Sequence, residues 1–306
     1  MEFGRVETSE INKIDFTLPA DGEQTKLTLN GEAINDPKFF VGCAKWGRKE
    51  WVNLIYPPKT KEKDFLGEYV KHFNSIELNA VFYGIPKEDQ ILKWKEMADQ
   101  RDDFLFCPKF SRAITHIKRL NNAQGETDLY LKAISQFDDK LGPCFLQLGD
   151  NFGPKNFEVL KRYLEALPRD LNLFLEVRHP DWFSVAADRK ALFSLLADLN
   201  IGAAITDASG RRDCVHMELP TPKAFIRFVG NGGKFLESSD KKRVDDWVER
   251  LQEWLSKGLE EVYFFLHQHD ESDTPIIADY TIEKFNKYLK ADLPRIKFLP
   301  NQGGLF

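Results

Sequence analysis

Eight short runs rich in β-branched and aromatic residues recur along the chain, and they constrain its fold more than any other feature. They begin near residues 39, 74, 103, 143, 171, 201, 224 and 261. Most gaps between them place apolar residues at helical spacing, as at Phe65, Tyr69 and Phe73. A strand followed by a helix, repeated eight times in units of roughly 30 residues, predicts an α/β fold with a single (β/α)8 barrel of the TIM type.

Two parts of the chain depart from this pattern. Residues 208–222, between the sixth and seventh runs, contain two prolines and no helical period, so we expect an irregular sixth unit with a loop in place of its helix. Residues 1–37 are turn-rich, and we interpret them as an N-terminal extension that precedes a barrel spanning residues 38–306.

An open, doubly wound sheet is the competing fold. Such a sheet would normally carry a glycine-rich phosphate loop after its first strand. The corresponding segment, GCAKWG at residues 42–47, does not match that loop, and no Walker motif occurs elsewhere. The pattern therefore favours the barrel.

Composition and charge limit the partners and the location of the chain. The formal net charge is −5, so no chain-wide basic field attracts nucleic acid. A local basic strip of Lys109, Arg112, Lys118 and Arg119 keeps a nucleic-acid partner open as an alternative. No apolar run approaches the roughly 18 residues of a membrane span, and the first residues lack the pattern of a secretory signal. We therefore expect a cytoplasmic protein with no membrane partner.

The four cysteines have no metal-binding or redox spacing. Cys43, Cys107 and Cys144 lie within apolar, strand-like runs, and Cys214 lies in the irregular sixth unit. We expect reduced thiols in the core.

Five motifs follow one another along the chain: VGCAKWGRKEWVNLIYP (41–57), FNSIELNAVFYGIP (73–86), CPKFSRAITH (107–116), FLQLGDNF (145–152) and LFLEVRHPDWF (173–183). Together they resemble the YecE-like family, also called domain of unknown function 72. The resemblance covers roughly residues 39–290; it implies a barrel fold and brings no established reaction. The eighth strand departs from the family pattern, because FFLHQHDESDTP (264–275) replaces a YFNN-like segment.

Polar side chains gather where the eight strands should end. Every second side chain of a strand points to the same side, and the active site of a barrel lies at the carboxyl ends of its strands. We predict an inward-facing set at that end; in strand order it comprises Lys45, Glu77, Asn79, Lys109, Gln147, Glu176, Arg178, Asp207, Arg227, His267 and His269.

This set contains more cations than carboxylates, and Arg112 and His116 follow the third strand closely. An excess of positive charge on a negatively charged protein indicates an anionic small-molecule ligand, such as a phosphate or carboxylate. Trp46 and Tyr83 lie just beyond strand ends, where flat rings would stack on a sugar or base. Tryptophans that merely roof the barrel explain the same positions equally well.

The first functional hypothesis is an enzyme of a hydrolase, isomerase or lyase type that performs acid–base chemistry on a small, anionic, phosphorylated or sugar-like substrate. Glu176 would act as general base or acid, with His116 or His179 as its partner. Glu77, Lys109 and Asp207 complete the candidate catalytic set. The remaining candidates would bind the substrate: Lys45, Trp46, Asn79, Tyr83, Arg112, Gln147, Arg178, His179 and Arg227.

Three alternatives remain open. His267 and His269, with Glu176 and Asp207, offer nitrogen and oxygen ligands for a divalent metal in a hydrolase or isomerase. A lysine desolvated inside a barrel, Lys109 or Lys45, would be a nucleophile for Schiff-base chemistry. The same pocket would also serve a barrel that binds a ligand or nucleic acid without catalysing a reaction. The sequence indicates no specific cofactor.

Overall fold

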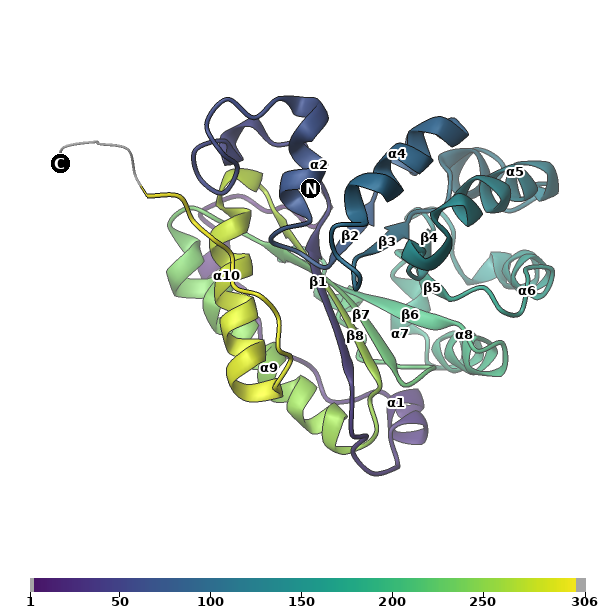
Figure 1. The fold of residues 1–306 in the computed structure, drawn as a ribbon. Coiled ribbons are helices and arrows are strands. Elements are labelled where there is room, and N and C mark those ends of the chain that lie inside the picture. The colour runs from purple at the N-terminus through teal and green to yellow at the C-terminus, as the bar shows by residue number, and fades with distance from the viewer. Residues whose placement is uncertain (1–2, 301–306) are drawn as a thin grey trace.

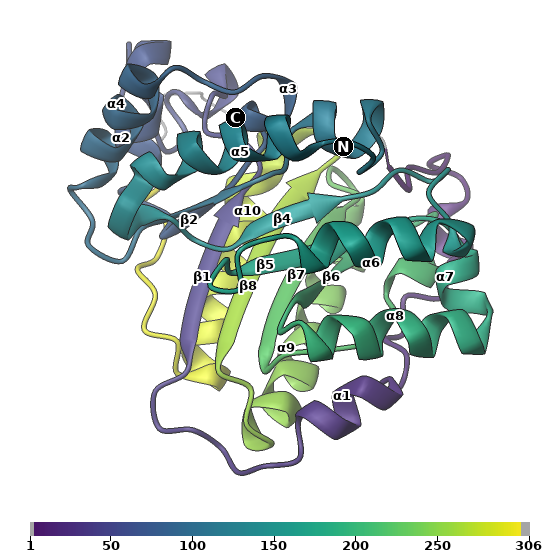
Figure 2. The ribbon, with the colours of Figure 1, turned by 90° about the vertical axis from the view of Figure 1, so that its right-hand side faces the viewer.

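The computed structural model describes residues 3–300 and contains one eight-stranded parallel sheet rolled into a barrel, so the predicted α/β barrel is confirmed (Figures 1 and 2). The strands match the eight predicted runs. They are β1 (Lys38–Cys43), β2 (Ser75–Leu78), β3 (Leu105–Pro108), β4 (Cys144–Gln147), β5 (Leu173–Glu176), β6 (Gly202–Asp207), β7 (Lys223–Gly230) and β8 (Glu261–Gln268).

The sheet closes between its two outermost strands. Its hydrogen-bonded order is β3-β2-β1-β8-β7-β6-β5-β4, so β3 and β4 are its edges. Isolated bridges pair Phe106 with Leu141 and Lys109 with Phe145 across this seam, and the Phe110 amide donates to the Phe145 carbonyl at 2.9 Å. These contacts complete the barrel, so the carboxyl ends of all eight strands surround one opening.

Helices cover the outside of the barrel (Figure 1). They are α1 (Glu23–Thr28), α2 (Phe65–Tyr69), α3 (Ala80–Tyr83), α4 (Glu88–Ala98), α5 (Gln124–Ile134), α6 (Phe157–Glu165), α7 (Asp181–Ser184), α8 (Ala186–Asp198), α9 (Lys241–Ser256) and α10 (Thr274–Lys284). Gly258 follows the end of α9, and its backbone has φ 101°. Positive φ just past a helix end is a conformation that glycine adopts without strain.

The sixth unit is irregular, as predicted. Only a short 3-10 turn, Arg212–Cys214, lies between β6 and β7. The N-terminal segment packs where the helix of this unit is missing. The Asp21 carboxylate accepts hydrogen bonds from Arg250 and Trp254 of α9, at 2.9 and 3.0 Å, and the Thr25 hydroxyl of α1 donates to the Met217 carbonyl at 2.8 Å. The segment thus covers the side of the barrel before the chain enters β1.

The lower interior of the barrel is an apolar plug. It consists of Cys107, Phe145, Phe174, Ala204, Phe225, Tyr263 and Phe265, and it separates the polar carboxyl end from the amino end of the strands. All four cysteines are buried and free, as expected. Within residues 3–300, no helix has the length and apolarity needed to cross a bilayer.

Asp207 lies outside the barrel interior, so its assignment to the inward-facing set is wrong. Its fully buried carboxylate forms an ion pair with Arg243 of α9 at 2.8 Å, accepts a hydrogen bond from Trp247 at 2.8 Å and also pairs with Arg212. The inward position of β6 is Thr206, two residues after Ala204 of the apolar plug. Asp207 therefore attaches β6 to α9.

We predict that Asp207→Asn lowers the free energy of unfolding by about 3 kcal/mol, because it removes the closer of the two buried carboxylates that pair with Arg243, the other being Asp240 at 3.3 Å. Urea denaturation of both proteins measures this loss. The control is Asp246→Asn, which removes a partly exposed ion pair with Lys242 on the same helix and should cost less than about 1 kcal/mol. Equal effects of the two substitutions would contradict this role of Asp207.

Candidate functional site

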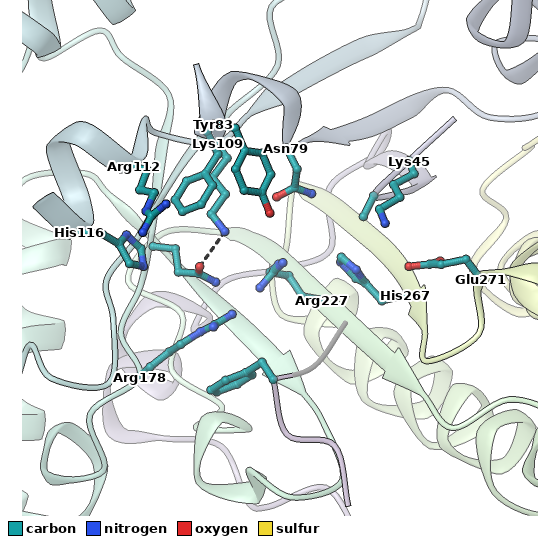
Figure 3. Close-up of a pocket in the computed structure, with 14 residues that line it drawn as sticks. Lys45, Asn79, Tyr83, Lys109, Arg112, His116, Arg178, Arg227, His267 and Glu271 are labelled. Carbon is teal, nitrogen blue, oxygen red and sulfur yellow. Dashed lines mark hydrogen bonds between the residues drawn. The ribbon is translucent and has the colours of Figure 1, made fainter. Parts of the chain in front are cut away.

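A cavity of about 540 Å³ opens at the carboxyl ends of the strands (Figure 3). Side chains from β3, β4, β7 and β8 form its floor, and loops and α3 form its walls. The lining residues are Phe3, Ala44, Lys45, Asn79, Phe82, Tyr83, Lys109, Arg112, His116, Gln147, Arg178, Arg227, His267 and Glu271. The cavity therefore lies where the barrel fold predicts a site.

A polar ring stands directly above the apolar plug: on six strands its member lies two residues after a residue of the plug, and β2 adds a seventh. Seven strands contribute Glu77, Lys109, Gln147, Glu176, Thr206, Arg227 and His267, all at most 7% exposed. We call these residues the polar ring. Alternation along each strand predicted all of them except Thr206.

Arg227 forms the centre of the polar ring. Its Nε and Nη2 donate to the two carboxylate oxygens of Glu77, both at 2.7 Å, and its Nη1 donates to Glu176 Oε2 at 2.6 Å. His267 Nε2 lies 2.9 Å from Glu77 Oε2, and Arg178 Nε donates to Glu176 Oε1 at 2.6 Å. Each buried carboxylate is thus paired with a guanidinium and has both oxygens occupied.

This pairing keeps both glutamates ionised. Burial alone would raise their pKa values, but Arg227 and His267 hold the pKa of Glu77 well below its usual range. For Glu176, burial likewise acts upward, and Arg178, Arg227 and Lys109 together lower its pKa to about 2. A carboxylate in this state accepts a proton poorly near neutral pH. The surroundings of Glu176 therefore suit it to position Arg178 and Arg227 better than to act as a general acid or base.

Lys109 differs from the other cations of the ring. Its Nζ donates to the neutral amide oxygen of Gln147 at 2.7 Å and lies 4.2 Å from the centre of the Phe82 ring. The side chain is 7% exposed, and burial, followed by the like charge of Arg227, lowers the pKa of its amine to about 7. A substantial fraction of this amine is therefore neutral near neutral pH, which is the state that a base or nucleophile needs.

His116 lies on the cavity wall, on a π-helical turn, Ala113–Ile117, that follows β3. Its Nδ1 lies 2.8 Å from the Thr115 hydroxyl, which fixes the ring. Partial burial and the charges of Lys109, Arg178 and Arg112 lower its pKa, so the imidazole is neutral near neutral pH. A neutral imidazole at a cavity wall can accept or donate a proton.

The cavity carries an excess of positive charge. The basic lining residues are Lys45, Lys109, Arg112, Arg178 and Arg227, whereas Glu271 is the single carboxylate among the described lining residues. Within residues 3–300, Lys45, Lys109 and Arg112 form no ion pair with a carboxylate. Figure 3 shows these side chains around one space, which suits an anionic ligand.

The N-terminal extension reaches this cavity, which the sequence did not indicate. The Phe3 ring lies 3.7 Å from the Arg178 guanidinium and 5.0 Å from that of Arg211, and the Gly4 carbonyl accepts a hydrogen bond from the Gly210 amide at 2.8 Å. A phenylalanine in a turn-rich segment has no periodicity that predicts such a contact. Phe82 and Glu271 also line the cavity and were missed, because strand alternation makes no prediction for the segments in which they lie.

Several predicted residues lie away from the cavity lining. The Trp46 ring packs edge-on against the ring of Trp94, with 5.4 Å between their centres, and it is absent from the cavity lining. His179 accepts a hydrogen bond from the Asp181 amide at 3.2 Å. Lys45, Asn79, Tyr83, Arg112, Gln147 and Arg178 do line the cavity, as predicted.

The two candidate metal ligands of β8 are separated. His267 is bound to Glu77 inside the barrel, whereas His269 lines a different hollow with Asn231 and Asp273. In the described part of the chain, no group of three or more His, Cys, Asp and Glu side chains is arranged to hold a metal ion. The metal-dependent alternative stays a prediction, which elemental analysis of untagged protein tests.

A family model described as "Protein of unknown function DUF72" matches residues 40–298. The chain belongs to this family. The YecE-like resemblance of its motifs is thereby confirmed. The DUF72 chain is 27% identical to the UPF0759 protein YecE of Escherichia coli K12 over 286 residues, which cover 88% of this chain and all of that protein. It is 24% identical to the UPF0759 protein YunF of Bacillus subtilis over 260 residues, covering 77% of this chain and 90% of YunF.

Solved structures of other DUF72 proteins have the same fold. One from Enterococcus faecalis superposes with a TM-score of 0.62 at 16% identity, over 84% of this chain and 99% of that one. One from Thermotoga maritima superposes with a TM-score of 0.59 at 21% identity, over 82% and 99% of the two chains. These likenesses support the barrel and say nothing about a reaction.

We predict that Lys109→Met raises the free energy of unfolding at pH 6 by roughly 1–3 kcal/mol, because it removes a buried charge that forms no ion pair with a carboxylate of residues 3–300. The pKa of Lys109 is lower in the folded than in the unfolded chain. Between about pH 7 and 10.5 the unfolded chain thus binds more protons, and stability rises with pH.

Urea denaturation at pH 6 and pH 9 measures both effects. The gain from Lys109→Met should shrink at pH 9, where the native amine is neutral. A loss of stability at pH 6 would show that the charged amine stabilises the fold.

Proposed function

We propose that this chain is an enzyme that binds a small anionic substrate in the cavity and moves a proton on it with Lys109 and His116. The observation that carries the proposal is a buried amine that faces the cavity with a neutral amide as its hydrogen-bond partner, in a lining where Lys45 and Arg112 have no carboxylate partner among the described residues. Perturbed groups in a cleft are typical of catalytic sites.

The anionic character of the substrate follows from the charge balance. Counting the glutamates beneath the floor, the cations Lys45, Lys109, Arg112, Arg178 and Arg227 face Glu77, Glu176 and Glu271, so positive charges exceed negative ones by five to three. With Lys109 neutral, the balance remains positive. A carboxylate or phosphate on the substrate would offset this charge.

The acid–base roles follow from which groups are free to change protonation. Glu77 and Glu176 are held ionised by their arginines, and their oxygens are occupied. Lys109 and His116 both line the cavity. Burial and neighbouring positive charges lower the pKa of each, and that of Lys109 falls to about 7. In this proposal the glutamates hold Arg227 and Arg178 in place, and Lys109 and His116 exchange protons with the substrate.

We expect ligand binding to depend on Arg112 and proton exchange to depend on His116. Small carboxylates and phosphoesters are screened by thermal shift, and those that bind are then incubated with the protein in D2O and followed by NMR for loss of protons next to a carbonyl. Arg112→Gln should weaken binding about tenfold, because a hydrogen bond to a charged group contributes roughly 1.5–3 kcal/mol. His116→Asn should retain binding and slow the exchange roughly 100-fold.

The control is Lys155→Gln, which removes an exposed charge from outside the cavity lining and should change neither quantity. Binding without exchange would indicate a barrel that binds a ligand without transforming it. Binding that is unaffected by Arg112→Gln would overturn the placement of the anion.

A further inference from the structure

Lys109 places a buried amine on the cavity floor. Lys109 lies just past the carboxyl end of β3, two residues after Cys107 of the apolar plug, and it faces the cavity. Phe82 and Phe145 flank it, with ring centres 4.2 and 5.7 Å from Nζ. Among the described residues its hydrogen-bond partner is the Gln147 amide oxygen, a neutral acceptor.

Lys140 shows how a structural buried lysine differs. Its side chain is 3% exposed, and its Nζ donates to the carbonyls of Arg101 and Asp102, at 3.0 and 2.8 Å, with Asp139 at 3.8 Å. It is absent from the lining of the cavity. Lys140 thus ties a loop down, whereas Lys109 presents its amine to an open space between aromatic rings.

Burial and the like charges of Arg227 and Arg178 disfavour protonation of Lys109, whereas Glu176 and Glu77 favour it. Arg227 belongs to the same ring and is committed to Glu77 and Glu176, so those carboxylates do not neutralise the amine directly. Arg178 and Arg112 line the cavity from other elements, and Figure 3 shows their guanidinium groups on the same side of the space as the Lys109 amine. An anionic group held there would bring a neighbouring carbon to Nζ.

We propose that Lys109 forms a Schiff base with a carbonyl compound that carries a carboxylate or phosphate. The inference rests on the proposed function and names its substrate class: an anionic aldehyde or ketone, such as a 2-oxo acid or a phosphorylated aldehyde. An imine at this position makes the neighbouring carbon acidic, which would support the proposed proton transfer although Glu77 and Glu176 are held ionised by arginines.

The step balances without an oxidant or reductant. The Nζ lone pair attacks the carbonyl carbon as the C=O π electrons move to oxygen, and a proton passes from nitrogen to that oxygen. His116, whose Nδ1 is occupied by Thr115, takes up a proton from solvent at Nε2 and passes it to the hydroxyl, which leaves as water while the imidazole returns to its neutral form. The products are a protonated imine on Lys109 and one water molecule.

The test is reductive trapping on the full-length protein. Pyruvate, glycolaldehyde phosphate and uncharged acetone are each incubated with the protein and cyanoborohydride, and labelled lysines are located by peptide mass spectrometry. Lys109 should be labelled at least about tenfold faster by the two anionic compounds than by acetone, and faster than the exposed Lys155. Pyruvate and glycolaldehyde phosphate distinguish a carboxylate from a phosphate as the recognised group. The labelling rate of Lys109 should rise with pH through about 7, where its amine loses the proton.

Two variants act as controls. We expect Lys109→Met to be at least as stable as the native chain at pH 6. It should show no label at position 109 and unchanged labelling of the surface lysines. Arg112→Gln should lower labelling by the anionic compounds about tenfold and leave labelling by acetone unchanged.

Labelling of surface lysines without preference for Lys109 would overturn the Schiff base. If anions still stabilise the protein and proton exchange still occurs in that case, the Schiff base is contradicted and the proposed acid–base function is not. If neither anion binding nor exchange occurs, the proposed function falls as well.

Discussion

The site depends on one buried guanidinium. Arg227 is 1% exposed and bridges Glu77 and Glu176, which come from strands on opposite parts of the barrel order. Three charges buried above an apolar plug would be costly if any of them lacked a partner. Because both carboxylates are saturated, by Arg227 together with His267 and Arg178, the floor of the cavity is fixed by charge-assisted hydrogen bonds from four strands and the segment after β5.

This arrangement determines what remains for chemistry. Once the two glutamates are committed, the hydrogen-bond partner of Lys109 within residues 3–300 is a neutral amide. Burial, followed by the like charges of Arg227 and Arg178, lowers the pKa of its amine to about 7 although Glu176 and Glu77 act in the opposite direction. The same commitment leaves Arg112 and Lys45 facing the cavity without carboxylates from the described part of the chain. The lowered pKa of Lys109 and the positive charge of the cavity wall thus both follow from the ion pairs of Arg227 with the two glutamates.

Much of this architecture could be predicted from periodicity. Eight β-rich runs were sufficient for the barrel, and a period of two along each strand identified Glu77, Lys109, Gln147, Glu176, Arg227 and His267 as inward-facing. The same rule was wrong at Asp207, because the last residue of β6 was taken as inward although Ala204 and Thr206 occupy the inward positions. His269 fell outside the ring because β8 ends at Gln268. Phe3 could not be predicted, since its contact joins segments distant in sequence, and the role of Glu176 depends on distances to two arginines.

Direct titration of Lys109 tests the central claim, which is that the Arg227 cluster leaves this amine buried, unneutralised and easily deprotonated. NMR of protein labelled with 13C at the lysine ε-carbon, with Lys109→Met to assign the signal, follows its protonation across pH 5 to 11. We expect the titration of Lys109 to have a midpoint near pH 7. A midpoint near 10.5, the ordinary value for a lysine, would contradict it.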